Sequence, residues 1–321
     1  MIKTVIIILF AWSLTSCRST SPEPNPAAAA AAELHGTTPL VKAAALGDSK
    51  TIEKLIKAGA DPNETSQHGV TALMAAARKG HKDAVRILLL RNADSNRVDE
   101  QGSTALHYAA LGSSAESVKL LVDHKAQLET KDSFDLTALM MAVRFANLAT
   151  VKALVNSGAS VHTADPNGWT AIHFAIPRGD AEIFEFLLDQ DVTLDQLDSD
   201  GDSLMVLALE YQQPYLVKRL TEAGAPLLQP DANGNTPLHL AVHQRNQQAI
   251  ELFLSKKVPV NAQNELGQVP VMLAIQNKDK EAISALIKAG ANLEIKDGQG
   301  RSAREWAKRM QLPDGLLKGS L

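Results

Sequence analysis

The sequence predicts an all-α solenoid of stacked helix-turn-helix units with β-turn fingers. One observation is a phrase close to Gly-x-Thr-Pro-Leu-His-x-Ala-Ala that recurs every 33 residues without insertion or deletion. Another is an alanine or valine that follows 24 positions after each of the first eight starts. A fixed period of this length is typical of stacked supersecondary units rather than of one globular core. The nine units, numbered one to nine, start at Gly36, Gly69, Gly102, Asp135, Gly168, Gly201, Gly234, Gly267 and Gly300.

The phrase itself predicts the first helix of each unit. Its threonine is suited to cap a helix with the side-chain hydroxyl. The prolines at 39 and 237 fall at the first helical position, where no N–H is needed. Leucine at the fifth position and alanine at the eighth are expected to pack between units. The predicted capping threonines are Thr38, Thr71, Thr104, Thr137, Thr170 and Thr236.

A second helix is predicted in each unit by apolar residues at i, i+3 and i+4, as in Val85, Leu88 and Leu89. Glycine ends this helix in four units, as expected of a left-handed C-cap. An aspartate three residues before most starts is expected to close the turn of the finger. The glycines are Gly59, Gly158, Gly224 and Gly290; the aspartates are Asp99, Asp132, Asp165, Asp198, Asp231 and Asp297.

The two ends of the array are predicted to be polar caps. Lys42 occupies a position that leucine fills in inner units, and residues 300–321 make an incomplete ninth unit whose helix carries Arg304, Glu305, Lys308 and Arg309. The sixth unit matches the phrase worst, because Ser203-Leu204-Met205-Val206 replaces Thr-Pro-Leu-His and Pro214 lies near its second helix. We expect local irregularity at residues 198–216.

The 33-residue repeat pattern resembles the ankyrin repeat over about nine-tenths of the chain. This resemblance implies a repeat domain at residues 34–321, with eight full repeats and a capping partial repeat from 300. It also implies that the repeat histidines His107, His173 and His239 make structural hydrogen bonds between neighbouring loops. The resemblance says less about function, because one fold supports many unrelated binding roles.

The N-terminus predicts export. Lys3 precedes a short apolar run at residues 5–12, too short to span a bilayer of about 30 Å. Leu14-Thr15-Ser16-Cys17 resembles a bacterial lipobox, which implies a signal peptide at 1–16 and lipidation of Cys17; the alternative is an ordinary signal peptide that contains a cysteine. Residues 17–33, rich in Pro, Ser and Ala, are expected to form a tether. By resemblance to Gram-negative lipoproteins, Arg18 favours the outer membrane, facing the periplasm.

Composition narrows the function classes. The net charge of −4 gives no general attraction for nucleic acid. Cys17 is the one cysteine, so no intramolecular disulfide can form. No nucleophile elbow, P-loop or Rossmann glycine pattern appears, so we expect no enzyme activity and no cofactor. We also expect a monomer.

Three motifs could form a metal site or a charged binding surface, but each also has a structural explanation. His239 and His243 have the i, i+4 spacing of zinc pairs, yet His239 belongs to the repeat phrase and no third ligand recurs. Asp198-Ser199-Asp200-Gly201-Asp202 is half of a calcium loop, but Gly201 and Asp198 are repeat positions. Residues 180–202 hold nine acids and no Lys or Arg, which fits either a solvated face or a surface that steers a basic partner.

The candidate binding residues are those that the repeat does not fix. In an ankyrin solenoid the finger tips and the outer side of the first helices form a concave surface, and aromatic residues and arginine dominate interface energies. We therefore expect these positions to be exposed and to bind a partner, although the rings alternatively pack against neighbouring fingers. The predicted partner-binding residues are Phe134, Leu136, Arg144, Phe145, Asn167, Trp169, Arg178, Glu210 and Tyr211.

Together these observations predict a lipid-anchored protein of the bacterial cell envelope that binds another protein. A sharper hypothesis is that it inhibits, or gives immunity to, a periplasmic or secreted enzyme. The alternatives are a non-inhibitory envelope adaptor and a surface-displayed protein that interacts with a host.

Overall fold

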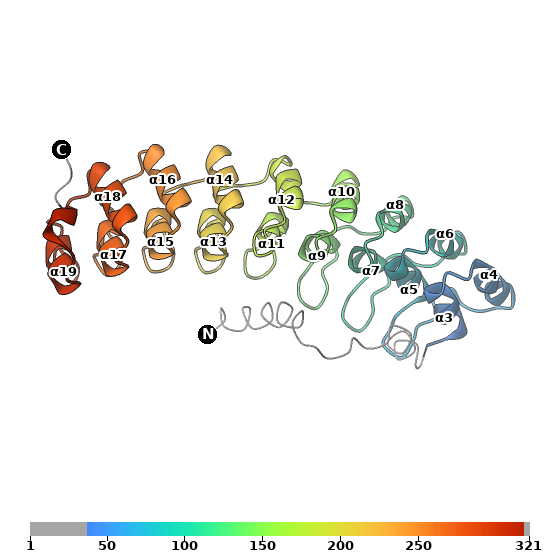
Figure 1. The fold of residues 1–321 in the computed structure, drawn as a ribbon. Coiled ribbons are helices and arrows are strands. Elements are labelled where there is room, and N and C mark those ends of the chain that lie inside the picture. The colour runs from blue at the N-terminus through green and yellow to red at the C-terminus, as the bar shows by residue number, and fades with distance from the viewer. Residues whose placement is uncertain (1–36, 318–321) are drawn as a thin grey trace, which may run out of the picture.

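In a computed structural model of the chain, residues 37–317 are described. They form one row of stacked helix pairs, with 17 α-helices, a short 3₁₀-helix and no named strand among these residues (Figure 1). The predicted all-α solenoid is therefore confirmed. The predicted signal peptide, Cys17 and the tether lie outside the described residues.

The helices lie in two rows (Figure 1). The first helices of the nine units are α3 (Pro39–Ala45), α5 (Ala72–Lys79), α7 (Ala105–Leu111), α9 (Ala138–Arg144), α11 (Ala171–Ala175), α13 (Leu204–Glu210), α15 (Pro237–His243), α17 (Pro270–Gln276) and α19 (Ala303–Arg309). The second helices are α4 (Ser49–Lys57), α6 (Lys82–Leu90), α8 (Ala115–Asp123), α10 (Leu148–Asn156), α12 (Ala181–Leu188), α14 (Pro214–Glu222), α16 (Gln247–Ser255) and α18 (Lys280–Lys288), and unit nine ends in η2 (Asp314–Leu317).

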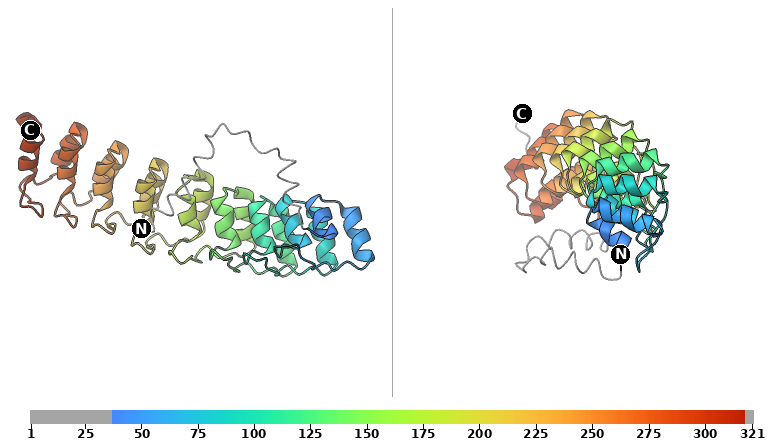
Figure 2. Two further views of the ribbon diagram at one scale, coloured as in Figure 1. Left: turned by 90° about the horizontal axis from the view of Figure 1, so that it is seen from below. Right: turned by 90° about the vertical axis from the view of Figure 1, so that its right-hand side faces the viewer.

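We call the side that carries the first helices and fingers the inner face, and the side that carries the second helices the outer face. In Figure 1 the fingers hang below the first helices and the N-terminal units bend toward that side. Figure 2 shows the helix pairs turning gradually about the long axis of the row. The inner face is thus a long surface to which every unit contributes a finger and a helix.

The first helices begin at the predicted residues, with one difference in how they are capped. The hydroxyls of Thr38, Thr71 and Thr137 accept the N–H of the third helical residue at 3.2–3.3 Å. Where that third residue is histidine, its Nδ1 instead accepts the backbone N–H of the threonine, at 3.1 Å for Thr104 and His107. The hydroxyl then bonds to the imidazole ring at 2.9 Å.

The core runs continuously along the solenoid between the two rows. The first two residues of the predicted stripe are buried in the second helices, as Val85 and Leu88 show. The third residue of the stripe is buried in unit two, where it is Leu89, and half-buried in units three, four and eight. The four predicted C-cap glycines have φ between 84° and 98°, a region that favours glycine. Both expectations are confirmed.

The expected irregularity of the sixth unit is wrong. Helix α13 has seven residues and Ser203 caps it by accepting the N–H of Val206. Pro214 stands at the first position of α14, where its missing N–H has no intrahelical partner to lose. The irregular unit is the fifth, in which α11 has only five residues. Pro177 cannot donate to the carbonyl of His173, four residues earlier, so the last turn tightens and Ile176 N bonds to that oxygen instead.

Both ends of the described chain carry polar side chains. Lys42 is exposed on the first helix of unit one, and Arg304, Glu305, Lys308 and Arg309 are exposed on α19. Ala307 is buried and Trp306 half-buried on the same helix. Helix η2 packs against α18 and so occupies the place of a second helix.

Candidate protein-binding surface

Each finger turns around one side-chain oxygen. In unit four, Oδ1 of Asp132 accepts the N–H of Phe134 at 2.9 Å and the N–H of Leu136 at 3.0 Å. The predicted role of the aspartates is thereby confirmed. The same pair of bonds is made by Asp99, Asp165, Asp198, Asp231 and Asp297, and by Ser66 and Asn264 in units two and eight.

This turn sends the two residues beside each start in different directions. The residue before the start, the tip residue, is exposed in every unit from two to nine except for the half-buried Asn167. The residue after the start, the inward residue, is buried or half-buried in all of them. The sequence predicts that both positions are exposed, and for the inward residues this is wrong.

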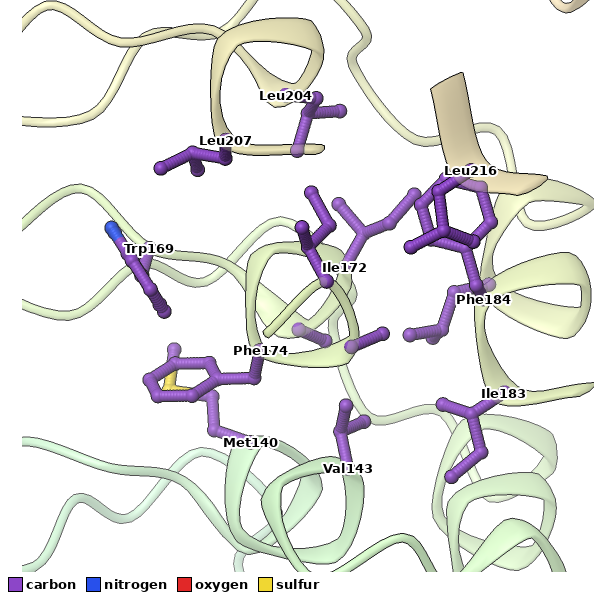
Figure 3. Packing of buried hydrophobic residues seen from close by; sticks show 14 of the residues in the cluster. Met140, Val143, Trp169, Ile172, Phe174, Ile183, Phe184, Leu204, Leu207 and Leu216 are labelled. Carbon is purple, nitrogen blue, oxygen red and sulfur yellow. The ribbon is translucent and has the colours of Figure 1, made fainter. Parts of the chain in front are cut away.

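Trp169 is the clearest correction, because it is an inward residue and only 9% exposed. Its ring meets the edge of Phe174 at a centroid distance of 5.3 Å, and Figure 3 shows it between Phe174 and Leu207. Its Nε1 donates to Oδ2 of Asp198 in the next finger at 3.2 Å. The ring therefore packs against its neighbours, which is the alternative considered above.

The other predicted residues divide between surface and interior. Leu136 is an inward residue and is 5% exposed, so it belongs to the core. Arg144 and Tyr211 are half-buried at the ends of α9 and α13, and Tyr211 packs against the core. Asn167 is half-buried, with its Nδ2 on Asp165 at 3.3 Å. Arg178 and Glu210 are exposed.

Two predicted residues are large, apolar and exposed. Phe134 is the tip residue of unit four and is 70% exposed, and Phe145 follows α9 and is 53% exposed. Leu111, at the end of the neighbouring α7, is 36% exposed. We call Leu111, Phe134 and Phe145 the apolar patch. Burying such exposed apolar side chains against a partner is favourable, so they are candidate contacts.

Sequence reasoning missed three exposed apolar residues at the same repeat positions. Leu111 and Leu46 end the first helices of units three and one, and Leu266 is the tip residue of unit eight. The repeat phase alone places all three on the inner face.

The acidic stretch does not form one surface. Asp180 caps α12, Asp198 holds a finger and Asp202 is buried. Glu185 accepts hydrogen bonds from Nε and Nη2 of Arg219 at 2.6 and 2.8 Å, and this pairing lowers the pKa of its carboxyl. The exposed acids that remain are Glu182, Asp189, Asp191, Asp195 and Asp200.

The repeat histidines His107, His173 and His239 are buried, and the first and third make the expected bond to the next unit, whereas Nε2 of His173 bonds to no described residue. Nε2 of His107 donates to the carbonyl of Leu136 at 3.0 Å, and Nε2 of His239 donates to the carbonyl of Gln268 at 3.0 Å. Burial lowers the pKa of both imidazoles. The ring nitrogens of His239 are thus committed and cannot join His243 in binding zinc. Within residues 37–317 no group of three or more His, Cys, Asp or Glu is placed to hold a metal ion.

The chain was also compared with known proteins. The family model described as ankyrin repeats (3 copies) matches residues 40–132, 117–200, 139–231 and 204–297. No curated protein matches the chain significantly. In the described part of the chain, no helix has both the length and the apolar character needed to cross a membrane.

Proposed function

Because this chain belongs to the ankyrin-repeat family, whose members act through protein–protein interaction and typically not as enzymes, we propose that it binds a protein of the bacterial cell envelope through the apolar patch. The observation that carries the proposal is the exposure of Phe134 and Phe145 on one unit of the inner face. Central aromatic residues contribute most to interface affinity, about 2 kcal/mol or more each.

The surroundings of the patch suit an interface. Arg144 is the last residue of α9, directly before Phe145, and is half-buried. Arginine is enriched in protein interfaces. Leu136 and Trp169 are buried, so they pack within the fold and do not face a partner. The proposed contact therefore centres on units three and four, closer to the N-terminus than the sequence suggested.

The envelope location rests on the sequence. The apolar run at 5–12 followed by Leu14-Thr15-Ser16-Cys17 supports export and lipidation. An acyl chain contributes about 0.8 kcal/mol of membrane affinity per buried CH₂. Replacing Cys17 with Ser is expected to abolish labelling by palmitate, and unchanged labelling would exclude the anchor.

We propose further that the partner is a periplasmic or secreted enzyme that the protein inhibits, as an immunity protein does. This rests on the combination of a lipid anchor, export, a preformed binding face and the absence of a catalytic motif from the sequence. The test is to assay the hydrolytic activity of the captured partner with and without the protein. Unchanged activity would favour a non-inhibitory adaptor.

The contact is tested by affinity capture from an envelope extract. The wild-type chain is compared with Phe134→Ala/Phe145→Ala, and Leu90→Ala serves as a control because Leu90 is an equally exposed apolar residue at the end of α6 on the outer face. We expect the double variant to lose the partner and the control to retain it. Equal capture by all three proteins would refute the apolar patch as the contact.

A further inference from the structure

A second part of the inner face is hollowed between units seven and eight. The hollow has a volume of about 380 Å³ and is formed by the fingers of both units with α15 and α17. Ligand pockets commonly have about 300–1,000 Å³. Its lining contains carboxamides and aliphatic side chains, with Glu265 as its one acidic residue and no Lys or Arg.

The floor of the hollow is held rigidly. Nδ2 of Asn264 donates to Oδ1 of Asn235 at 2.8 Å, which ties the two fingers together. Nδ2 of Asn235 donates to Asp231 at 3.0 Å, and Nε2 of His239 donates to the carbonyl of Gln268. Because these groups are already hydrogen-bonded to one another, the shape of the hollow is preformed.

The rim, in contrast, carries polar side chains without hydrogen-bond partners among the described residues. The side chains of Asn233, Gln268 and His243 make no hydrogen bond with another described residue. Nε2 of Gln276 is buried in the lining and has no acceptor among residues 37–317. Each carboxamide carries donors and an acceptor on one planar group. The side chains of Leu240, Leu266 and Leu273 add apolar walls, and Leu266 is 67% exposed.

We propose that this hollow binds an extended peptide segment without acidic residues through its main chain, with one apolar side chain against the leucines. A peptide backbone presents the alternating neutral N–H and C=O groups that carboxamides match. A phosphate or carboxylate ligand would meet no cation here, and nucleic acid relies on Lys and Arg for its phosphates. The segment belongs to a protein partner, so this inference rests on the proposed function.

The test uses a random nine-residue peptide library displayed on phage, selected on the full-length protein. Selected peptides should share one apolar residue and no acidic consensus. Gln268→Ala and Gln276→Ala should each weaken binding of a selected peptide about 3- to 10-fold. Gln248→Ala is the matched control, since Gln248 is an exposed carboxamide of α16 on the outer face. Thermal unfolding of each variant verifies that it is folded.

Methylating the backbone nitrogens of the selected peptide one at a time separates main-chain from side-chain recognition. At least one methylation should weaken binding by 10-fold or more while the side chains stay unchanged. The inference is overturned if no peptide is selected, if methylation has no effect, or if the two glutamine variants bind as the control does. These results involve units seven and eight only, so they are independent of capture through Phe134 and Phe145.

Discussion

The indole Nε1 of Trp169 donates a 3.2 Å hydrogen bond to Oδ2 of Asp198, on the finger of the following unit. The same carboxylate accepts the N–H groups of Asp200 and Asp202 through Oδ1. Trp169 therefore links two fingers and also covers the buried Phe174. Its contribution is to stability rather than to a binding surface.

This relationship predicts the effect of removing the ring. Trp169→Ala should reduce the free energy of unfolding by about 3–5 kcal/mol, because it opens a cavity in the core. Trp169→Phe keeps most of the apolar contact but leaves Asp198 without the indole donor, and should cost about 1–2 kcal/mol. Urea unfolding followed by circular dichroism measures both. A loss below 0.5 kcal/mol for Trp169→Ala would show that the ring is not structural.

The two residues beside the start of unit four should behave in opposite ways. Leu136→Ala removes a core side chain and should reduce the free energy of unfolding by about 2–5 kcal/mol. Phe134→Ala removes an exposed ring and should change it by less than about 0.5 kcal/mol. The urea midpoints of the two variants decide the matter. Similar losses in both would contradict the opposite orientations of the tip and inward residues.

The repeat phase predicted the architecture because period, caps and turn residues all depend on local spacing. It predicted the finger aspartates and the exposed Phe134 and Phe145 for the same reason. It failed at Leu136 and Trp169, because the direction of a side chain beside a turn depends on how the returning segment of the finger meets the helix. It also misplaced the irregular unit, since Pro214 and Pro177 look alike in sequence and differ only in their position within a helix.

The buried histidines predict a stability that falls in mild acid. Burial lowers the pKa of His107 and His239, and it lowers the pKa of His173 from 6.5 to about 4. The unfolded chain therefore takes up protons near pH 6.5 while the folded chain does not. Stability is fully present above pH 6.5 and is lost as the pH falls toward 4, by about 3 kcal/mol for His173 alone.

Urea midpoints at pH 7.5 and pH 5 measure this loss. His173→Gln cannot titrate and should lose less stability than the wild type between the two pH values. His243→Gln is the control, because His243 is exposed on the inner face. If His173→Gln and the wild type lose the same stability, His173 does not carry the effect.

At the junction between units five and six, Trp169 bonds to Asp198 and Arg219 bonds to Glu185, but the repeat histidine makes no bond to the next unit. Nε2 of His173 has no acceptor among residues 37–317, whereas His107 and His239 bond to the next unit. Helices α11 and α13 also approach each other less closely along their lengths than other neighbouring first helices.

We therefore expect α11 to open locally more often than α7 and α15, because it is shorter and its histidine lacks the bond to the next unit. Hydrogen exchange measured by mass spectrometry should show faster exchange in peptides that cover residues 171–177 than in those that cover Ala105–Leu111. Pro177→Ala restores an N–H that can donate to the carbonyl of His173, so it should lengthen α11 and slow exchange there. Pro214→Ala is the matched control, because a proline at the first position of α14 blocks no helical bond. Exchange in α11 that equals that in α7, or that Pro177→Ala leaves unchanged, would show that the shortened helix does not loosen the junction.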